Sequence, residues 1–333
     1  MGPLLFAAFI KEIITSLSLP FYLFADDLVL LAADTNVNVI VEMLNHNLSN
    51  LDKWCSDNKL NISIEKSKFM VFHKSHDTKM GQVPKVHING QEIERVYQFK
   101  YLGVWIDPTM SFNNHFDMVN SRLSSAIGKL YSVKRFISLK VNVILIKTYI
   151  LSAYDYCIDI WAIHSRLELA VMQNKVNRYL YSCIYPSLFR KLRKSHNKSN
   201  RDKRKSKYYR KKDLDMEEIY KICKFSPIFD RANWTRAKNV LKYLISPVEN
   251  LNSFYRFASN TRNSRSLPLL ETESCNTETF RKSVKFKTIS YWNTLPKTWS
   301  LMDKGKEISL KKFKNMDFDY QTQDRNSDWL KFR

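Results

Sequence analysis

The stretch Phe21-Tyr22-Leu23-Phe24-Ala25-Asp26-Asp27-Leu28-Val29-Leu30-Leu31 places two adjacent carboxylates between apolar runs. Aromatic and aliphatic residues on both sides favour two short strands, and Ala25-Asp26-Asp27 supplies the polar break of a tight hairpin turn. Neighbouring carboxylates repel each other, so a site that keeps both ionised usually supplies a divalent cation such as Mg²⁺, which prefers oxygen ligands. The stretch indicates a metal-dependent phosphoryl site, and a solvated turn of an ordinary hairpin is the alternative that it leaves open.

Composition points to a polyanionic partner. The chain has 333 residues, of which 44% are hydrophobic, enough for two or three domains with a sizeable core. Its 54 lysines and arginines outnumber its 32 acids, for a formal net charge of +22. A membrane surface is the competing polyanion, but the basic residues do not line one amphipathic helix beside a lipid anchor. Nucleic acid is therefore the preferred partner.

Other features indicate an intracellular protein without a membrane span. The five cysteines include no Cys-x-x-Cys pair and no histidine at zinc-finger spacing, and we interpret them as reduced thiols. The apolar opening, residues 1–10, lacks a basic leader region and is too short to cross a bilayer. The longest later apolar run, residues 141–163, contains Lys147, Asp155 and Asp159, so it is interpreted as a core helix.

The first 110 residues carry mixed helical and strand patterns. Apolar residues follow helical spacing over 4–14, and again over 37–54, where an amphipathic helix should lie with its apolar face against the hairpin. Residues 68–72 and 99–107 are each predicted to form one strand, the second stopped by Asp107-Pro108. Asn89-Gly90 between short apolar runs is a strong hairpin signal.

The chain then becomes helical. Helices are predicted over 112–130, 139–162 and 167–185, which together make a plausible bundle, and over 214–223 and 232–245. Further on, residues 280–284 are interpreted as a strand, 291–296 as a short helix ended by Pro296, and Phe313 as part of a last basic helix.

Residues 186–212 contain 13 lysines and arginines against Asp202, more than half of the net charge. Basic side chains release counterions from phosphates, and tyrosines among them could stack on unpaired bases. A nuclear-import address and a solvated linker remain open for the same residues. The candidate nucleic-acid contacts in this tract are Arg190, Lys191, Arg193, Lys194, Arg201, Lys203, Arg204, Lys205, Lys207, Tyr208, Tyr209, Arg210, Lys211 and Lys212.

Taken in this order, the pieces resemble the reverse transcriptase of non-LTR (LINE-type) retrotransposons, especially the jockey- and CR1-like group. Phe24-Ala25-Asp26-Asp27 is similar to its catalytic box, and Gly2-Pro3-Leu4-Leu5-Phe6 resembles the end of an upstream motif. Lys66-Ser67 resembles the Lys-Thr pair that follows the palm helix, with serine in place of threonine. Tyr101-Leu102-Gly103-Val104 resembles the Leu-Gly motif of the primer-grip hairpin. Tyr291-Trp292-Asn293-Thr294-Leu295-Pro296 resembles the post-polymerase region.

The resemblance implies an α+β fold: a partial right-hand polymerase palm of β-hairpins and a helix, then a helical thumb and a mixed, mostly helical carboxyl-terminal region. The corresponding division is a palm with primer-grip-like hairpin over 1–110, a thumb-like region over 111–185, a basic linker over 186–212 and a post-polymerase region over 213–333. Its partners would be an RNA template, a DNA primer and, in the parent enzyme, a dNTP.

The resemblance also assigns roles to residues. Asp26 is the first Mg²⁺ ligand, and Asp27 a weaker ligand or supporting acid whose alternative is closing the turn. Lys66 would meet charge on the leaving phosphate, or else be a solvated lysine. Tyr101, Leu102 and Gly103 would hold the primer-grip-like hairpin, where glycine lets the hairpin approach the primer backbone, or else simply pack.

A polymerase of this kind needs another metal-binding aspartate from an earlier palm strand, together with fingers, and the sequence before the hairpin offers only Glu12, which does not match. We therefore expect negligible polymerase activity for this chain alone and only weak Mg²⁺ binding, as in a 5′-truncated remnant. A non-catalytic nucleic-acid-binding protein that uses the thumb and the basic tract is the second hypothesis. A gene model that truly continues upstream into a working enzyme is the third.

Overall fold

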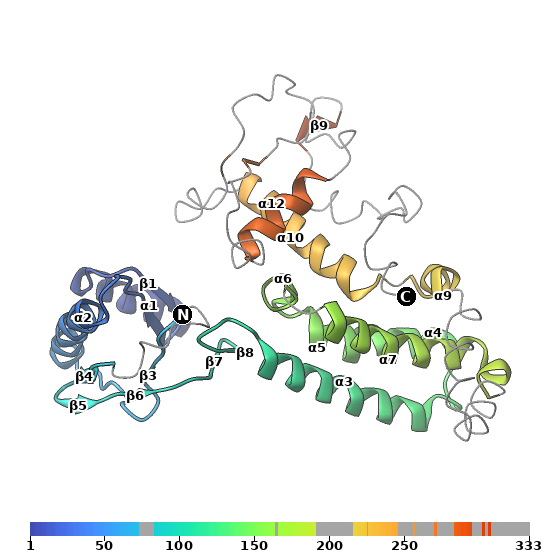
Figure 1. The fold of residues 1–333 in the computed structure, drawn as a ribbon, viewed down its shortest axis with the longest axis horizontal. Coiled ribbons are helices and arrows are strands. Elements are labelled where there is room, and N and C mark those ends of the chain that lie inside the picture. The colour runs from blue at the N-terminus through green and yellow to red at the C-terminus, as the bar shows by residue number, and fades with distance from the viewer. Residues whose placement is uncertain are drawn as a thin grey trace. The chain divides into compact units, whose positions relative to one another are not determined.

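A computed structural model describes residues 1–72, 83–163, 166–190, 216–224, 226–245, 256, 270–271, 283–294, 302–303 and 306–307. The chain divides into two compact units, Met1–Phe112 and Asn113–Arg333, each taken by itself below. Figure 1 shows the first unit as a mixture of helices and short strands and the second as mainly helical. The mixed α+β character predicted from the sequence is confirmed.

The first unit begins with helix α1 (Gly2–Ile10), which tightens into the 3₁₀ turn η1 (Lys11–Ser16). The hairpin of β1 (Phe21–Phe24) and β2 (Asp27–Leu30) follows, and then the long helix α2 (Val37–Asp57). The Asn36 side chain accepts a hydrogen bond from the Asn38 N–H and so caps α2. The predicted hairpin and both predicted helical stretches are confirmed.

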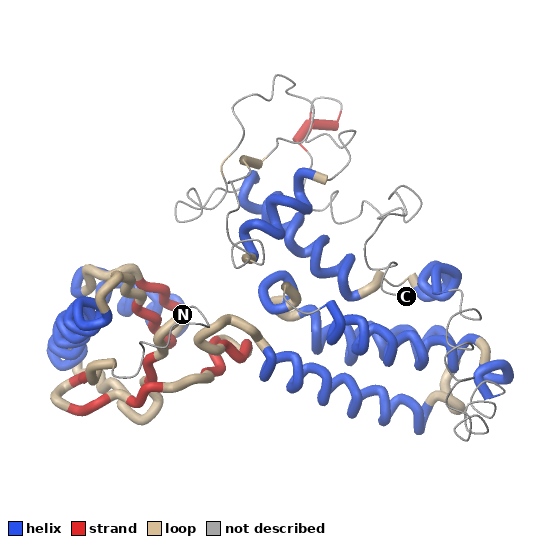
Figure 2. The backbone as a smooth tube through the Cα atoms, in the orientation of Figure 1, coloured by secondary structure: helices blue, strands red, loops and turns tan. Residues whose placement is uncertain are grey.

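Short strands complete the unit, and Figure 2 shows them in red. They are β3 (Lys68–Phe69), β4 (His87–Ile88), β5 (Gln91–Glu92), β6 (Glu94–Arg95), β7 (Phe99–Tyr101) and β8 (Val104–Ile106). Strands β4 and β5 form the predicted hairpin, with Asn89 and Gly90 both at positive φ, and β3 pairs parallel to β6. The strand predicted over 68–72 is thus confirmed for two residues only.

The single strand predicted over 99–107 is wrong. Strands β7 and β8 pair antiparallel, with Phe99 opposite Ile106 and Tyr101 opposite Val104. The two residues between them, Leu102 and Gly103, have φ angles of +43° and +87°, which reverse the chain. A leucine in the left-handed region gives no local turn signal, so the apolar alternation alone did not reveal this hairpin, whereas the resemblance of Tyr101-Leu102-Gly103-Val104 to the primer-grip motif implied it.

The core of the first unit lies between α2 and the strands. Buried side chains of α2 contact buried residues of the β4–β5 region, and the hairpin residues Leu23, Leu28 and Leu30 pack half-buried against them. The predicted contact between the apolar face of α2 and the hairpin is therefore confirmed. The buried members are Ile13, Val41, Leu48, Leu51, Cys55, Val86, Ile88 and Ile93.

The second unit is built mainly from helices. They are α3 (Asn113–Val133), α4 (Leu139–Leu145), the π-helical turn η2 (Ile146–Leu151), α5 (Ser152–Asp155), α6 (Ile158–Trp161), α7 (Arg166–Ile184), α9 (Met216–Cys223), α10 (Ile228–Ile245) and α12 (Val284–Asn293). The short strands β9 (Met302–Asp303) and β10 (Lys306–Glu307) pair antiparallel. Helices α3 and α7 lie side by side and bury Leu123, Val176 and Tyr179. The helical spacing predicted for α3, α7, α9 and α10 is confirmed.

A buried polar network joins α7 to α9 and to the start of α10. Asn177 Oδ1 accepts hydrogen bonds from Gln173 Nε2 at 2.6 Å and from the Tyr220 hydroxyl at 3.0 Å. Gln173 Oε1 accepts from the Ile228 N–H at 2.8 Å. Burial raises the pKa of Tyr220 well above its ordinary value, so the tyrosine stays a neutral donor.

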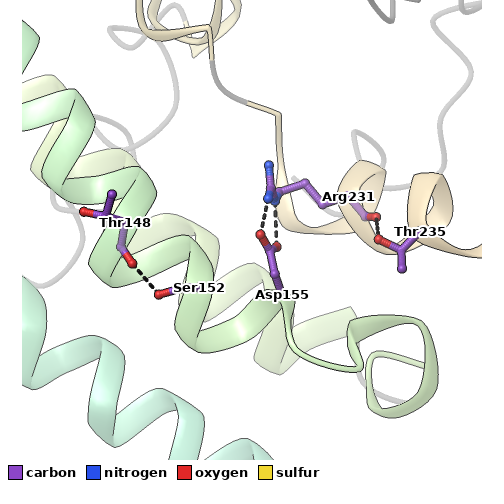
Figure 3. A network of polar contacts seen from close by, with 5 residues as sticks. All are labelled: Thr148, Ser152, Asp155, Arg231 and Thr235. Carbon is purple, nitrogen blue, oxygen red and sulfur yellow. Dashed lines mark hydrogen bonds and ion pairs between the residues drawn. The ribbon is translucent and has the colours of Figure 1, made fainter. Parts of the chain in front are cut away.

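The continuous helix predicted over 139–162 is wrong at one place. Helix α5 ends at Asp155, Cys157 takes a left-handed φ of +51°, and α6 restarts at Ile158. No glycine or proline stands at this break. Instead α10 holds it: Arg231 forms an ion pair with Asp155 (Figure 3), and Arg236 donates to the backbone oxygens of Asp159 and Ala162. Contacts from α10, a helix remote in the sequence, therefore hold residues on both sides of the break.

Towards the carboxyl terminus, the strand predicted over 280–284 is wrong at its end, because Val284 begins α12 and the Ser283 hydroxyl caps that helix. The short helix predicted over 291–296 is the end of α12, which stops at Asn293. Pro296 and the helix predicted around Phe313 lie outside the described residues. Among the helices that the structure describes, none combines the length and the apolar character needed to cross a bilayer.

Candidate active site at the β1–β2 hairpin

The hairpin turn consists of Ala25 and Asp26, because Phe24 pairs directly with Asp27. Ala25 has a φ of +54°, while Asp26 stays at negative φ. Positive φ at the first loop residue matches the twist of two-residue hairpins, and it is strained for any residue with a Cβ. The sequence therefore folds here into a tight turn that projects Asp26, with Asp27 as the first residue of β2.

The two faces of the hairpin differ. Leu23 and its partner Leu28 face the core, whereas Tyr22 and Phe24 are 55% and 64% exposed. Paired residues of an antiparallel ladder share a face, so Asp27 lies on the face of its partner Phe24. Both acids are exposed, and among the described residues neither carboxylate has a hydrogen-bond or ion-pair partner.

This donor set fits a hard cation. Carboxylate oxygens are the ligands that Mg²⁺ prefers, and these two acids are exposed and adjacent. Within the described part of the chain, no group of three or more His, Cys, Asp or Glu side chains gathers as a metal site. The hairpin alone thus supplies two carboxylates.

Tyr101 of the β7–β8 hairpin lies within electrostatic reach of Asp27. Tyr101 is half-buried at the end of β7; burial raises the pKa of its phenol, and the charge of Asp27 raises that pKa further. Asp27 therefore lies near enough to Tyr101 to act on its ionisation. Leu102, half-buried, and Gly103, exposed, form the adjoining turn, where positive φ explains the glycine.

The structure describes two of the other predicted site residues, Lys66 and Arg190. Lys66 is exposed in a turn that precedes β3, and in the described structure no hydrogen bond or ion pair joins it to Asp26 or Asp27. Arg190 is exposed, and its Nε donates to the Pro186 oxygen at 3.4 Å. The candidate nucleic-acid contacts from Lys191 to Lys212 lie outside the described residues.

One residue that bears on the hairpin was missed from the sequence. Asn47 lies on α2 among the buried apolar positions, is 2% exposed, and accepts hydrogen bonds from the Ser18 and Leu19 N–H groups. A polar residue at helical spacing within an apolar stripe is a signal that could have drawn attention to it.

An apolar hollow of about 440 Å³ borders the acid-bearing turn. It lies between α1, η1 and the hairpin, and α1 itself buries none of its residues. The hollow is lined by Pro3, Phe6, Ala7, Ile10, Lys11, Ile14, Phe21, Leu23 and Ala25.

Comparison with known proteins shows what this region resembles. Residues 1–106, which include the hairpin, α2 and the β7–β8 hairpin, match the family model described as reverse transcriptase (RNA-dependent DNA polymerase). The resemblance to a reverse transcriptase is confirmed. Asp26 and Asp27 thus lie within residues 1–106, the part of the chain that matches this family model.

Two curated relatives narrow the resemblance. The chain is 26% identical over 161 residues to the RNA-directed DNA polymerase from mobile element jockey of Drosophila funebris. It is 22% identical over 149 residues to the protein of the same name in Drosophila melanogaster. The alignments cover 46% and 44% of this chain, but only 17% and 16% of those relatives' own lengths. No solved structure matches. The resemblance is therefore to part of a jockey-type reverse transcriptase.

Proposed function

We propose that residues 1–106 act as palm elements of a non-LTR retrotransposon reverse transcriptase, in RNA-directed DNA synthesis. The observation that carries this proposal is the exposed, unpaired carboxylate pair on the β1–β2 hairpin, within the segment that matches the family. An RNA template, a DNA primer and a dNTP are the substrates that this activity implies.

The site residues take distinct roles in this proposal. Asp26 and Asp27 would hold Mg²⁺, which would activate the primer 3′-hydroxyl and stabilise the leaving pyrophosphate. Tyr101, whose pKa the charge of Asp27 raises, leads into the Leu102-Gly103 turn, which supports the primer end. Lys66 meets charge on the leaving phosphate. In the second unit, α3 to α7 act as the thumb.

We also propose that this chain alone synthesises little DNA. The hairpin supplies two carboxylates, and clamping two ions on an incoming triphosphate takes further oxygen ligands and groups that orient the triphosphate. An additional acid from another polypeptide segment would complete the site.

Primer extension on poly-rA and oligo-dT with Mg²⁺ tests both statements. We expect, from this chain alone, no synthesis above that of its Asp26→Asn variant. Robust synthesis that is lost on Asp26→Asn would contradict the incomplete site while supporting the palm role. Robust synthesis that Asp26→Asn leaves intact would contradict the palm role itself.

A second candidate function is binding of nucleic acid without catalysis. The observation that favours it is the concentration of 13 lysines and arginines in residues 186–212, together with Tyr208 and Tyr209. Such a tract neutralises phosphates and offers rings to unpaired bases. The same residues suit a nuclear-import address, which would direct the protein to the nucleus. Loss of nuclear accumulation when Lys203, Arg204 and Lys205 are changed to alanine tests that location.

A further inference from the structure

Asn47 makes an unusually complete set of hydrogen bonds for a side chain in an apolar helix face. Its Oδ1 accepts from the Ser18 N–H at 2.8 Å, the Ser18 hydroxyl at 3.1 Å and the Leu19 N–H at 3.1 Å. Its Nδ2 donates to the Met43 oxygen at 2.9 Å, within the same helix. Two backbone N–H groups can only donate, so the orientation of the amide is fixed.

These contacts lie at the base of the acid-bearing hairpin. Leu19 is 6% exposed and is followed by Pro20, after which β1 begins at Phe21. The Pro20 oxygen accepts from the Leu31 N–H at 2.8 Å, which ties the end of β2 to the same point. Asn47 therefore joins α2 to the place where both strands of the hairpin start and end.

The hairpin converts a small movement at this base into a larger one at its tip. Each strand has four residues, so at roughly 3.3 Å per residue the turn lies about 13 Å from the base. A tilt of about 10° at the base would then move the turn by about 2 Å. Displacements of about 1 Å already impair sites that must hold reacting groups in place.

We propose that Asn47 is a positioning residue that fixes the turn carrying Asp26 and Asp27. The residue lies at the opposite end of the hairpin from the acids, so it acts through the backbone of residues 18–20. Its link to metal binding rests on the proposed function, whereas its hold on the hairpin does not.

The same helix offers a matched control. Asn45 Oδ1 accepts from the His87 N–H at 2.9 Å, and its Nδ2 donates to the Lys85 oxygen at 3.4 Å. Asn45 thus ties α2 to the β4 region, with the same side chain and the same kind of contact. Asn45→Ala removes a helix-to-loop anchor while leaving the hairpin base untouched.

The experiment compares the full chain with its Asn47→Ala, Asn47→Asp, Asn45→Ala and Asp26→Asn variants. Hydrogen exchange of peptides covering residues 18–31 reports on the hairpin, and electron paramagnetic resonance of free Mn²⁺ reports on binding of that ion. Thermal unfolding checks that each variant is folded. Asn47→Asp keeps the acceptor oxygens, so it serves if Asn47→Ala fails to fold.

We expect Asn47→Ala to speed exchange in residues 18–31 by about tenfold and to weaken Mn²⁺ binding by about fivefold, below the loss typical of a group bonded directly to a ligand. Asn45→Ala should change both by less than about twofold, and Asn47→Asp should fall between them. Equal exchange in Asn47→Ala and Asn45→Ala, both folded, would overturn the positioning role.

The two proposals fail in distinguishable ways. Mn²⁺ binding that is the same in the full chain and in Asp26→Asn contradicts the metal site of the proposed function. The exchange measurement then still decides whether Asn47 holds the hairpin. If Asn47→Asp also exchanges as fast as Asn47→Ala, the acceptor oxygens are not what holds the base, and the inference fails.

Discussion

At the scale of single residues, the backbone stores strain beside the acids. Ala25 occupies the left-handed region at a φ of +54°, directly before Asp26. That conformation costs an L-residue roughly 1–2 kcal/mol. Strained positions persist only where the surroundings hold them, here the ladder of β1 with β2 and its packing on α2.

Glycine should relieve this strain. Ala25→Gly removes the Cβ, but it also frees the unfolded chain, an effect of about 0.4–1 kcal/mol in the opposite direction. We expect the free energy of unfolding to stay equal or rise by up to about 1.6 kcal/mol, measured by urea denaturation. Ala32→Gly, at a position without positive φ, should instead lower it by about 0.4–1 kcal/mol. If Ala25→Gly lowered the free energy of unfolding as much as Ala32→Gly does, the proposed strain at Ala25 would be contradicted.

Asp107 makes stability depend on pH. Burial alone would raise its pKa, but donors from Thr109, Ser111 and Phe112 outweigh burial and lower the pKa below its ordinary value of 3.8. The shortest of these bonds is from the Thr109 hydroxyl, at 2.6 Å. A carboxyl whose folded pKa is lowered adds stability that is present above its unfolded pKa and is lost as pH falls through the folded one.

We therefore expect Asp107→Asn to be less stable than the wild type at pH 7, with the difference shrinking as pH falls below about 4. Urea denaturation at pH 7, 5 and 3 measures it. Asp57→Asn, which changes an exposed acid at the end of α2, should alter stability little at pH 7. A difference for Asp107→Asn that is the same at pH 7 and pH 3 would argue against the lowered pKa.

At the residue level, the sequence predicted features that depend on neighbouring residues in the chain. The turn at Asp26 could be predicted because its acids interrupt two apolar runs. The effect of Asp27 on Tyr101 could not, because the two residues belong to different hairpins and are more than 70 residues apart in the sequence. Asn47 was overlooked because apolar periodicity identifies the buried face of a helix but does not show which groups a polar residue on that face binds.

At the scale of elements, the broken helical run depends on α10. Arg236 is 3% exposed, and burial lowers the pKa of its guanidinium to about 10. It donates to the Asp159 and Ala162 oxygens, each at 3.2 Å, and to Asn233 Oδ1 at 2.7 Å. The guanidinium thus binds backbone oxygens at the end of α6, where helices leave carbonyls unpaired.

Arg236→Met should lower the free energy of unfolding by about 2–3 kcal/mol, because it leaves those buried carbonyls without donors. Lys242→Met, on the exposed face of the same helix, should change it by less than about 0.5 kcal/mol. Chemical denaturation measures both, and thiol labelling of Cys157 should speed up in Arg236→Met only. Matching stabilities of the two variants would show that α10 does not hold the break.

Prediction from the sequence succeeded for elements whose signal is local. Helix α2 and helix α7 carry their apolar periodicity within themselves, and the β4–β5 turn is encoded by Asn89-Gly90. The break at Cys157 is encoded elsewhere, since Arg231 lies 76 residues from its partner Asp155. The apolar periodicity of residues 139–162 does not predict a contact with a residue so far along the chain.

At the scale of the whole molecule, the net positive charge is the property that bears most on binding. A net charge of +22 predicts binding of single-stranded nucleic acid that weakens as salt rises. Each phosphate that the protein neutralises adds about −0.7 to the slope of log affinity against log salt. Deletion of residues 191–212 should therefore flatten this slope by about 0.7 for each phosphate that the tract neutralises. Fluorescence anisotropy with a single-stranded oligonucleotide measures the slope.

A variant of unchanged length separates charge from chain length. Lys203, Lys205, Lys207 and Lys211 changed to glutamine should flatten the slope by up to about 3, in proportion to the phosphates that the tract no longer neutralises. The same number of glutamines at Lys11, Lys53, Lys129 and Lys242, outside the tract, should flatten it less. Equal effects would mean that binding responds to total charge and not to this tract.

The left-handed Cys157 also sets an order of events during folding. Residues 139–162 leave the ribosome before α10 is made, and helices form within about a microsecond, much faster than the chain grows. We expect the nascent run to form one straight helix, which the later arrival of Arg231 and Arg236 must bend into two. Folding of this unit would then pass through a stage with more helix at 156–157 than the finished protein has.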